Sequence, residues 1–454
     1  MAARDLCWTR GRSALSLRMT CACLSVHKFP CQFPVETEFF SFDGKQWCSF
    51  HLPLRDAAGN DSVKGRGEEG WEEKGTEWQM FEAEIYARLR AGQPWNRLDD
   101  VDDNRADLQG VAFPHNFNFT GITEPLQVNF TDAAFGDNAN FEDATFGDWA
   151  SFDRATFGDS AHFGRVTFSR VAGFEGAKFG DYAFFNGATV GGNAVFSGAT
   201  FGNGADFSNV TFQGVSDFSA GERRDAKPDF QYVGFYNTTF TDECTFENRS
   251  FVSPADFNDA TFHDLVEFHG CTFHPGMSFH QAKFLKTKGW DDEATEKLER
   301  SYRTLKLEME KLRARNEEAD FFALEMECRR QRGTVPRLER FAATAYKHLS
   351  DYGRSIAKPL LWMAFLLGYS FAYFYHLAQA KSFHAPARVL RFVMEQITTP
   401  FSIWRNEYKF DPWMIEYLKE QPLLLRAPAT LMTLMAITLA ALFLLALRRR
   451  FKMD

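Results

Sequence analysis

The chain has 454 residues, a formal net charge of −9, and 50 Phe against 12 Tyr and 10 Trp. This length allows two or three units that each have a core of their own. The excess of Phe excludes an ordinary globular domain and indicates a repeat built on that residue. The eight cysteines are spread too unevenly for a small secreted disulfide scaffold.

The segment 1–18 is rich in Arg and has no apolar centre, so it does not read as a secretory signal peptide. Two interpretations stay open for it. Either it forms a transit-like leader, or it is upstream sequence and the true start is Met19. We favour the second interpretation, because regular sequence begins only at Cys21.

Residues 19–60 form a module rich in cysteine and histidine. Cys23, Cys31, Cys48 and His51 supply three thiolates and one imidazole, a ligand set that suits tetrahedral structural zinc. Cys21 offers a further thiol. The spacing is not that of a standard zinc finger, so reduced thiols without a metal are the alternative. Residues 61–104 are predicted to be a linker with a short helix.

A phenylalanine repeat fills residues 105–287. From Phe130 onward, Phe recurs at alternating steps of five and six residues, and Ala or Val stands two residues before nearly every Phe. Such a period fits neither a helix nor an alternating strand. It fits a coil that turns a corner about every five residues, with Phe and the small residue pointing inward and Gly, Asn and Asp at the corners. Val190 fills the one missing slot, and the register breaks after Ser219 and is predicted to resume at Phe235.

This pattern resembles the pentapeptide-repeat family, and Ala106-Asp107-Leu108-Gln109-Gly110 matches the usual unit of that family. The resemblance implies a mainly β fold, a right-handed four-sided β-helix. Four sides of five and six residues make a coil of about 22 residues, so residues 130–284 predict roughly seven coils, or about 34 Å at the ~4.8 Å spacing of paired strands. Residues 106–285 carry 23 acidic against 9 basic side chains, which predicts an acidic surface.

Residues 288–350 show helical spacing. The apolar positions are followed by Asn316 and two Glu, which is typical of a helix start. We expect a helical hairpin that caps the β-helix, and the alternative is one continuous coiled-coil arm with Asn316 in its seam. The apolar positions are Leu298, Tyr302, Leu305, Met309 and Leu312 in the first helix, and Ala319, Phe322, Ala323 and Met326 in the second.

Residues 351–454 are predicted to be a two-span membrane domain. Residues 359–378 and 427–447 contain no formally charged side chain and are long enough to cross about 30 Å of hydrocarbon, with buried core helices as the alternative. An excess of Lys and Arg in residues 329–358 and after residue 447 predicts an inner or plasma membrane protein with both termini in the cytosol. For the apolar part of the loop, residues 389–404, an interfacial helix or an external loop is favoured over a pore.

Two further segments resemble bacterial membrane-anchored pentapeptide-repeat proteins. These are Tyr302-Arg303-Thr304-Leu305-Lys306 and Tyr352-Gly353-Arg354-Ser355, which extend the resemblance to nearly the whole chain. No phosphate-binding loop, nucleophile elbow or His-Glu-x-x-His motif occurs, so we expect no enzymatic activity. Four histidines follow repeat phenylalanines on different sides of the coil and are not expected to form a site: His263, His269, His274 and His280.

The leading hypothesis for function is a membrane-anchored, cytosol-facing scaffold. The acidic face of the β-helix would bind an unknown protein partner, the spans would contact the lipid bilayer, and a homo-oligomer is compatible with the sequence. One alternative is a small two-span channel or transporter with a β-helical regulatory domain. A second is a DNA-mimic topoisomerase inhibitor, which membrane tethering disfavours. No basic stripe for binding nucleic acid is present.

Overall fold

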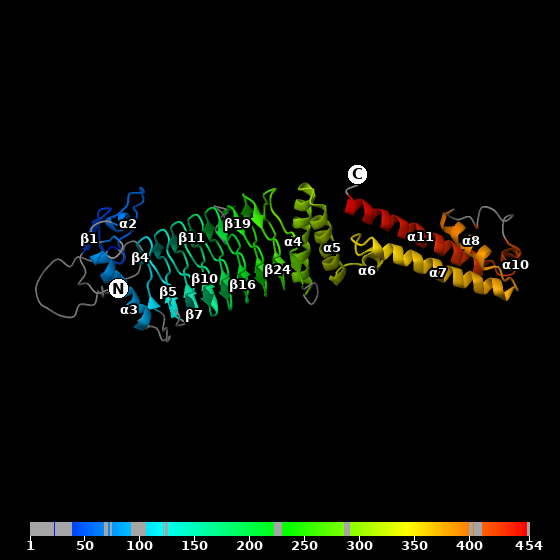
Figure 1. The fold of residues 1–454 in the computed structure, drawn as a ribbon, viewed down its shortest axis with the longest axis horizontal. Coiled ribbons are helices and arrows are strands. Elements are labelled where there is room, and N and C mark those ends of the chain that lie inside the picture. The colour runs from blue at the N-terminus through cyan, green and yellow to red at the C-terminus, as the bar shows by residue number, and fades with distance from the viewer. Residues whose placement is uncertain are drawn as a thin grey trace, which may run out of the picture. The chain divides into compact units, whose positions relative to one another are not determined.

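The computed structural model describes residues 22, 39–67, 71–72, 75–91, 106–120, 122, 126–221, 229–285, 291–398, 403 and 411–451. The chain forms two compact units, Met1–Thr287 and Lys288–Asp454. The first unit contains a parallel β-solenoid of about eight turns and the second is helical (Figure 1). The predicted fold, a β-helix followed by helices of which two are long and apolar, is confirmed.

A small module precedes the solenoid. It contains an antiparallel pair, β1 (Phe39–Phe42) and β2 (Lys45–Cys48), and the helices α2 (Val63–Arg66) and α3 (Thr76–Ala91). Helix α3 buries Phe81, whose ring lies 5.8 Å from that of Phe113 and 5.6 Å from that of Phe117, both in the first coil. The module therefore covers the first coil of the solenoid with apolar side chains and protects its open edge.

Each coil of the solenoid contributes to four ladders of short parallel strands, which we name sides A to D in chain order. Side A contains β3 (Ala106–Asp107), β5 (Leu126–Asn129), the end of β7 (Thr145–Ser151), β10 (Val171–Gly173), β13 (Ala194–Val195), β17 (Ser216–Asp217), β21 (Cys244–Thr245) and β25 (Val266–Glu267). Side B contains β4 (Ala112–Phe113), β6 (Ala134–Phe135), β8 (Thr156–Phe157), β11 (Lys178–Phe179), β14 (Thr200–Phe201), β18 (Asp229–Phe230) and β22 (Ser250–Phe251).

The other two sides complete each coil. Side C contains single bridges from Asn118 to Asp206 and then β15 (Ala205–Asp206), β19 (Val233–Gly234) and β23 (Ala255–Asp256). Side D contains the start of β7, β9 (Thr167–Phe168), β12 (Thr189–Val190), β16 (Thr211–Phe212), β20 (Thr239–Phe240), β24 (Thr261–Phe262) and β26 (Lys283–Phe284). Figure 1 shows the coils stacked from cyan to green.

The register between coils corrects one detail of the sequence-based prediction. Regular coils have the predicted length, as where Ala194 pairs with Ser216, but the next coil is longer, because Ser216 pairs with Cys244. After this insertion the ladder resumes at Phe230, which pairs with Phe201, so the prediction that it resumes at Phe235 was wrong. The whole solenoid has about eight turns, which are the roughly seven predicted for residues 130–284 and a first coil that starts before Phe130.

The core is a set of stacked phenylalanine rings. Phe157 lies between Phe135 and Phe179, with ring centroids 4.7 and 4.6 Å away and interplanar angles of 5° and 2°. Ala155, two residues before Phe157, is fully buried. Val190 takes the place of Phe between Phe168 and Phe212, as predicted. The regular part of the repeat therefore buries one large and one small side chain on each side of a coil.

The second unit begins with two helices, α4 (Asp292–Lys311) and α5 (Arg315–Gln331), that pack on each other as a hairpin rather than as one continuous arm. Asn316 is not the N-cap, because α5 starts at Arg315 and has no side-chain cap. The second helix buries Phe321, whereas we expected Phe322. Both differences have the same cause: the hairpin loop sets the rotation of α5, and the sequence does not show the loop conformation.

Glu327 of α5 gives this helical group a pH dependence. Burial alone would raise the pKa of Glu327, but hydrogen bonds from Arg330 and Lys347 outweigh it and set the pKa at about 2, below the ordinary 4.5. The ionised carboxylate therefore stabilises the fold above the ordinary pKa, and this contribution is lost as the pH falls towards 2. We expect a loss of about 2–3 kcal/mol in that window, measured by denaturant titration. A Glu327→Gln variant should lack the pH slope, and an unchanged slope would contradict the assignment.

The remaining helices form one apolar bundle. They are α6 (Arg337–Ser350), α7 (Ala357–Ala380), α8 (Pro386–Thr398), α10 (Pro412–Glu420) and α11 (Pro422–Phe451). Helices α7 and α11 have mean hydropathies of 1.3 and 2.4, and both are long and apolar enough to cross a membrane. Helix α8 lies in the loop between them and packs on both, with Phe392 against Phe374 at 5.1 Å between ring centroids.

Candidate functional site

Side C of the solenoid and its edge towards side B are acidic. Asp137, Asp159 and Asp181 occupy the same corner position in successive coils, and Asp206 and Asp256 point outward on side C. Asp137 and Asp159 each use Oδ1 to accept the backbone N–H of the next Asp, at 2.9 and 2.8 Å. These bonds fix the spacing of the carboxylates at the coil repeat. No Lys or Arg stands at either of these positions in any described coil.

Two arginines of the solenoid, Arg154 and Arg165, are paired away from side C. Arg154 binds Asp132 of the preceding coil with Nε–Oδ1 at 2.8 Å, and Arg165 binds Asp143 at the same distance. These pairs raise the pKa of both guanidinium groups, chiefly through the hydrogen bonds. Among the corner carboxylates, Asp137 lies 3.2 Å from His115 Nδ1, and the charge of Arg55 acts on both Asp137 and Asp159. The negative charge that these groups leave uncompensated is therefore that of Asp181 and of the side C carboxylates beyond it.

Exposed aromatic rings lie beside the acidic residues. Tyr182, Tyr232 and Tyr236 are 50%, 44% and 45% exposed. Phe184 stacks on His162 with a centroid distance of 5.2 Å. An outward-facing group of rings among carboxylates offers both cation–π and ionic contacts, which is the chemistry that recognises Arg and Lys side chains. We call Asp159, Asp181, Tyr182, Phe184 and Tyr232 the side C patch.

Tyr182 has an unfavourable backbone conformation. Its φ is +61°, at a corner where Asn116, Asn138 and Ser160 adopt the same left-handed conformation in the preceding coils. Asn and Ser tolerate this region, whereas a bulky side chain there costs about 1–2 kcal/mol. The ring of Tyr182 covers Gly204, where a Cβ atom would lie only 2.7 Å from the ring. Tyr182 is therefore an exposed aromatic residue in a conformation that a small polar residue would adopt at lower cost.

Arg249 is a second feature that the repeat does not require. It stands two residues before Phe251, a position that elsewhere holds a small residue, and it is 1% exposed. Its guanidinium donates to the carbonyl oxygens of Phe218, of Ala199 at 2.7 Å and of Phe196 at 3.1 Å. Burial lowers the pKa of Arg249 to about 10, with Asp217 opposing, so the side chain stays charged at neutral pH. Its surroundings are closed, which makes it structural rather than a binding group.

Two of the predicted zinc ligands meet in the N-terminal module. The distance between Cys48 Sγ and His51 Nδ1 is 3.1 Å, and both residues are buried. Cys23 and Cys31 lie outside the described residues. Ala22, their described neighbour in sequence, donates its N–H to the carbonyl of Gln46 in β2 at 2.8 Å. Cys48 and His51 are residue types that bind zinc, their 3.1 Å distance is that of a hydrogen bond, and the zinc prediction stays a prediction.

Lys64 lies close to this pair and was not anticipated. Its ammonium is fully buried, donates to the carbonyl of Ser49 at 2.7 Å, and lies 4.2 Å from the ring centroid of Phe81. Burial holds the pKa of Lys64 well below its usual range, and the charge of Cys48 opposes this shift. The only sequence signal was its position just after Ser62, the N-cap of α2, which gives no hint of burial.

The solenoid histidines do not converge. His263, His269, His274 and His280 follow the Phe of sides D, A, B and C in turn, so each lies at a different corner. In the part of the chain that the structure describes, no group of three His, Cys, Asp or Glu side chains is placed to hold a metal ion.

The comparisons with known proteins agree with this architecture. The model of the family described as pentapeptide repeats (9 copies) matches residues 152–195, 174–221 and 235–283. No curated protein and no solved structure matches the chain. The matched residues are the coils that form the four ladders on either side of the insertion. The coils within residues 152–221 and 235–283 therefore match the pentapeptide-repeat family.

Proposed function

We propose that this protein is a membrane-anchored interaction scaffold without catalytic activity, and that its side C patch binds a basic segment of a partner protein. The observation that carries the proposal is Tyr182, an exposed ring kept in a strained conformation beside Asp181. Strain of this kind persists where it serves binding. Solenoids commonly use an extended face to bind partners, and those of this family are generally not catalytic.

The membrane anchor in this proposal is the pair α7 and α11. Their apolar side chains are exposed along most of both helices, for example Leu361 at 69%, Phe365 at 62% and Leu431 at 59%. Such a surface suits lipid rather than water. The excess of Lys and Arg before α7 and at the end of α11 supports a cytosolic location for both termini and for the solenoid.

Replacing Tyr182 by Asn, together with Asp181 by Asn, should separate binding from stability. Asn suits the left-handed conformation and keeps the Oδ1 acceptor, so we expect the solenoid to be unchanged or up to about 1 kcal/mol more stable. Binding of the partner should fall about tenfold or more, as for loss of an aromatic hot spot. The measurement is quantitative cross-linking of the full chain in native membranes, followed by an affinity titration with the partner that is identified.

A matched control removes one exposed ring and one exposed carboxylate from other parts of the solenoid. Trp149→Thr with Glu175→Gln does this, because Trp149 is 54% exposed and neither residue belongs to side C. This control variant should bind the partner as the wild type does. Equal capture by both variants would remove the side C patch from the proposal.

The second candidate, a small two-span channel, is supported by the position of α8. The hydroxyl of Thr433, on the buried face of α11, lies 3.0 Å from the carbonyl oxygen of Ala429 in the same helix and 3.2 Å from that of Gln396 in α8. Because Thr433 lies well inside a helix proposed to cross the membrane, α8 would enter the bilayer rather than stay at its surface. Ion conductance in liposomes that contain the full chain would support the channel. Liposomes that stay impermeable would reject the channel in favour of the scaffold.

We also propose structural zinc in the N-terminal module, held by Cys48 and His51 with thiolates from Cys23 and Cys31. The short distance between Cys48 and His51 supports this assignment. We expect about one zinc per chain in protein purified under reducing conditions, and loss of that zinc in Cys48→Ser, measured by elemental mass spectrometry. Cys328→Ser is the control, since Cys328 lies in α5. Unchanged zinc content in Cys48→Ser would reject the site.

A further inference from the structure

We infer that α6 lies in the headgroup region of the bilayer, with an apolar stripe inserted at the acyl boundary and Arg337, which flanks that stripe, on anionic phospholipid. The inference rests on the membrane anchoring proposed above and adds a second lipid contact to it. The partner is the lipid surface that α7 and α11 enter, and no protein is required.

The stripe lies on one face of α6. Leu338, Phe341, Ala342, Ala345 and Leu349 follow helical spacing, and Leu338 and Phe341 are 80% and 72% exposed. The opposite face of α6 is occupied, because Ala343 and Ser350 are buried there and the helix contacts α5, α7 and α11. The N-terminal part of the stripe, Leu338, Phe341 and Ala342, therefore remains uncovered after α6 has packed on its own unit. Ala345 is half-buried, and Leu349 packs partly against the apolar core of the bundle.

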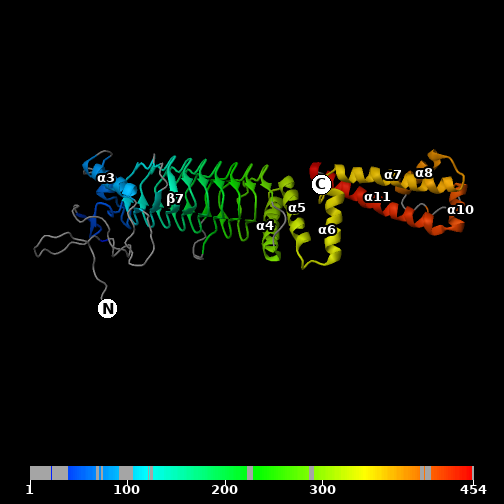
Figure 2. The same cartoon turned by 90° about the horizontal axis from the view of Figure 1, so that it is seen from below.

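The direction of α6 suits a membrane surface. Figure 2 shows α6 crossing α7 and α11 at a steep angle, close to the start of α7. Helix α6 ends at Ser350 and α7 begins at Ala357. Trp362, in the second turn of α7, donates its indole N–H to the carbonyl of His348 at 3.3 Å. This bond holds the C-terminal end of α6 beside the second turn of α7. If α7 crosses the bilayer, α6 lies along the interface, where Trp is favoured.

The charges beside the stripe favour anionic lipid over a second copy of this chain. Arg337 flanks the stripe and has no carboxylate partner within the described residues. Arg340 lies on the opposite side of the helix, and Lys347 is paired with Glu327 at 2.9 Å. Arg448 adds positive charge near the end of α11. Two copies packed through this stripe would bring like charges together, which disfavours the contact, whereas anionic headgroups attract each basic residue.

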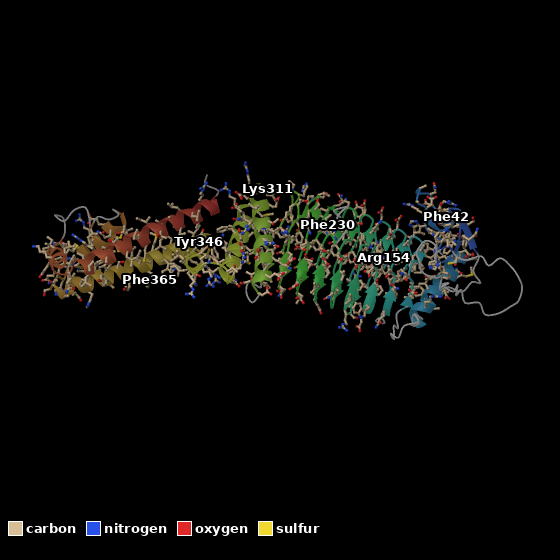
Figure 3. The ribbon with its side chains drawn as sticks, turned by 180° about the vertical axis from the view of Figure 1, so that it is seen from behind. Phe42, Arg154, Phe230, Lys311, Tyr346 and Phe365 are labelled. Carbon is tan, nitrogen blue, oxygen red and sulfur yellow. The ribbon has the colours of Figure 1, made fainter. Side chains whose placement is uncertain are left out.

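Photo-crosslinking of the full chain in nanodiscs of mixed anionic and neutral phospholipid tests the inference. The photoreactive amino acid p-benzoylphenylalanine replaces Phe341 in one variant, Phe365 of α7 (labelled in Figure 3) in a second, and Trp149 of the solenoid in a third. All three positions are exposed aromatic residues, at 72%, 62% and 54%, so the substitutions are matched. We expect position 341 to form about tenfold more lipid adduct than position 149.

Each result decides between the alternatives. Lipid adducts at 341 and 365 but not at 149 support the inference. Lipid adduct at 365 alone, or a crosslink from 341 to a second copy or another protein, overturns it and leaves the membrane anchor intact. Lipid adduct at neither 341 nor 365 overturns both the inference and the anchoring on which it rests.

Discussion

Replacing Arg249 by Ala should lower the free energy of unfolding of the coils around the insertion by about 3–5 kcal/mol. The reason lies in the backbone bonds that the insertion removes. In regular coils, the carbonyls of Ala155 and Ala177 accept N–H groups from the next coil at 2.8 and 2.9 Å. At the equivalent Ala199 the donor is the guanidinium of Arg249, at 2.7 Å. Without it, buried carbonyls lose their partner.

A double-mutant cycle isolates this role. Deleting residues 222–227 shortens the long coil between Ser216 and Cys244 to the length of the coil between Ala194 and Ser216, so regular bonding between coils can be restored. In that background, Arg249→Ala should cost far less than in the wild type, because the small residue then matches the repeat. Local stability is best measured by hydrogen exchange of peptides from residues 194–221 and 244–265.

Two further variants define what counts against the assignment. Arg249→Lys keeps the charge but offers fewer donors in a less suitable arrangement, so we expect it to recover only part of the loss. Lys178→Ala, at an exposed site in β11, should have little effect. Equal costs of Arg249→Ala with and without residues 222–227 would show that the arginine does not compensate for the insertion.

The contrast between the regular coils and Arg249 marks what the sequence could predict. The period of Phe130 and its successors follows directly from the coil geometry, because one inward side chain is needed on each side. Arg249 breaks that pattern, and from the pattern alone it would be interpreted as a random departure from the repeat. Its partners, Phe196 and Ala199, lie about two coils away. Only the stacked structure brings them together.

The side C patch was predictable in charge but not in detail. The acidic excess of residues 106–285 is visible in the sequence. The significance of Tyr182 is not, because the sequence does not show that its column adopts positive φ or that Gly204 lies beneath its ring. Likewise, the pairing of Cys48 with His51 followed from their spacing, whereas the burial of Lys64 beside them depended on the packing of α2 and α3.

Phe157→Ala tests the regular part of the core and should cost about 3–5 kcal/mol. The ring of Phe157 is 2% exposed and has parallel neighbours on both sides, Phe135 and Phe179, together with an edge-to-face contact to Phe163 at 5.4 Å. Removal leaves a cavity that Ala155 is too small to fill. The β-ladder above and below holds the backbone in place, so the cavity cannot collapse. The loss of unfolding free energy should therefore lie at the upper end of the range for large-to-small core substitutions.

The same substitution near the end of the stack provides the comparison. Phe273 is only half-buried and has one parallel neighbour, Phe251, at 5.5 Å between ring centroids. Phe273→Ala should therefore cost about 1–2 kcal/mol, because less area is buried and the last coil relaxes more readily. Hydrogen exchange of the matching coil peptides measures both losses on one scale. Equal losses at Phe157 and Phe273, or none at Phe157, would contradict a core whose stability comes from continuous ring stacking along the solenoid.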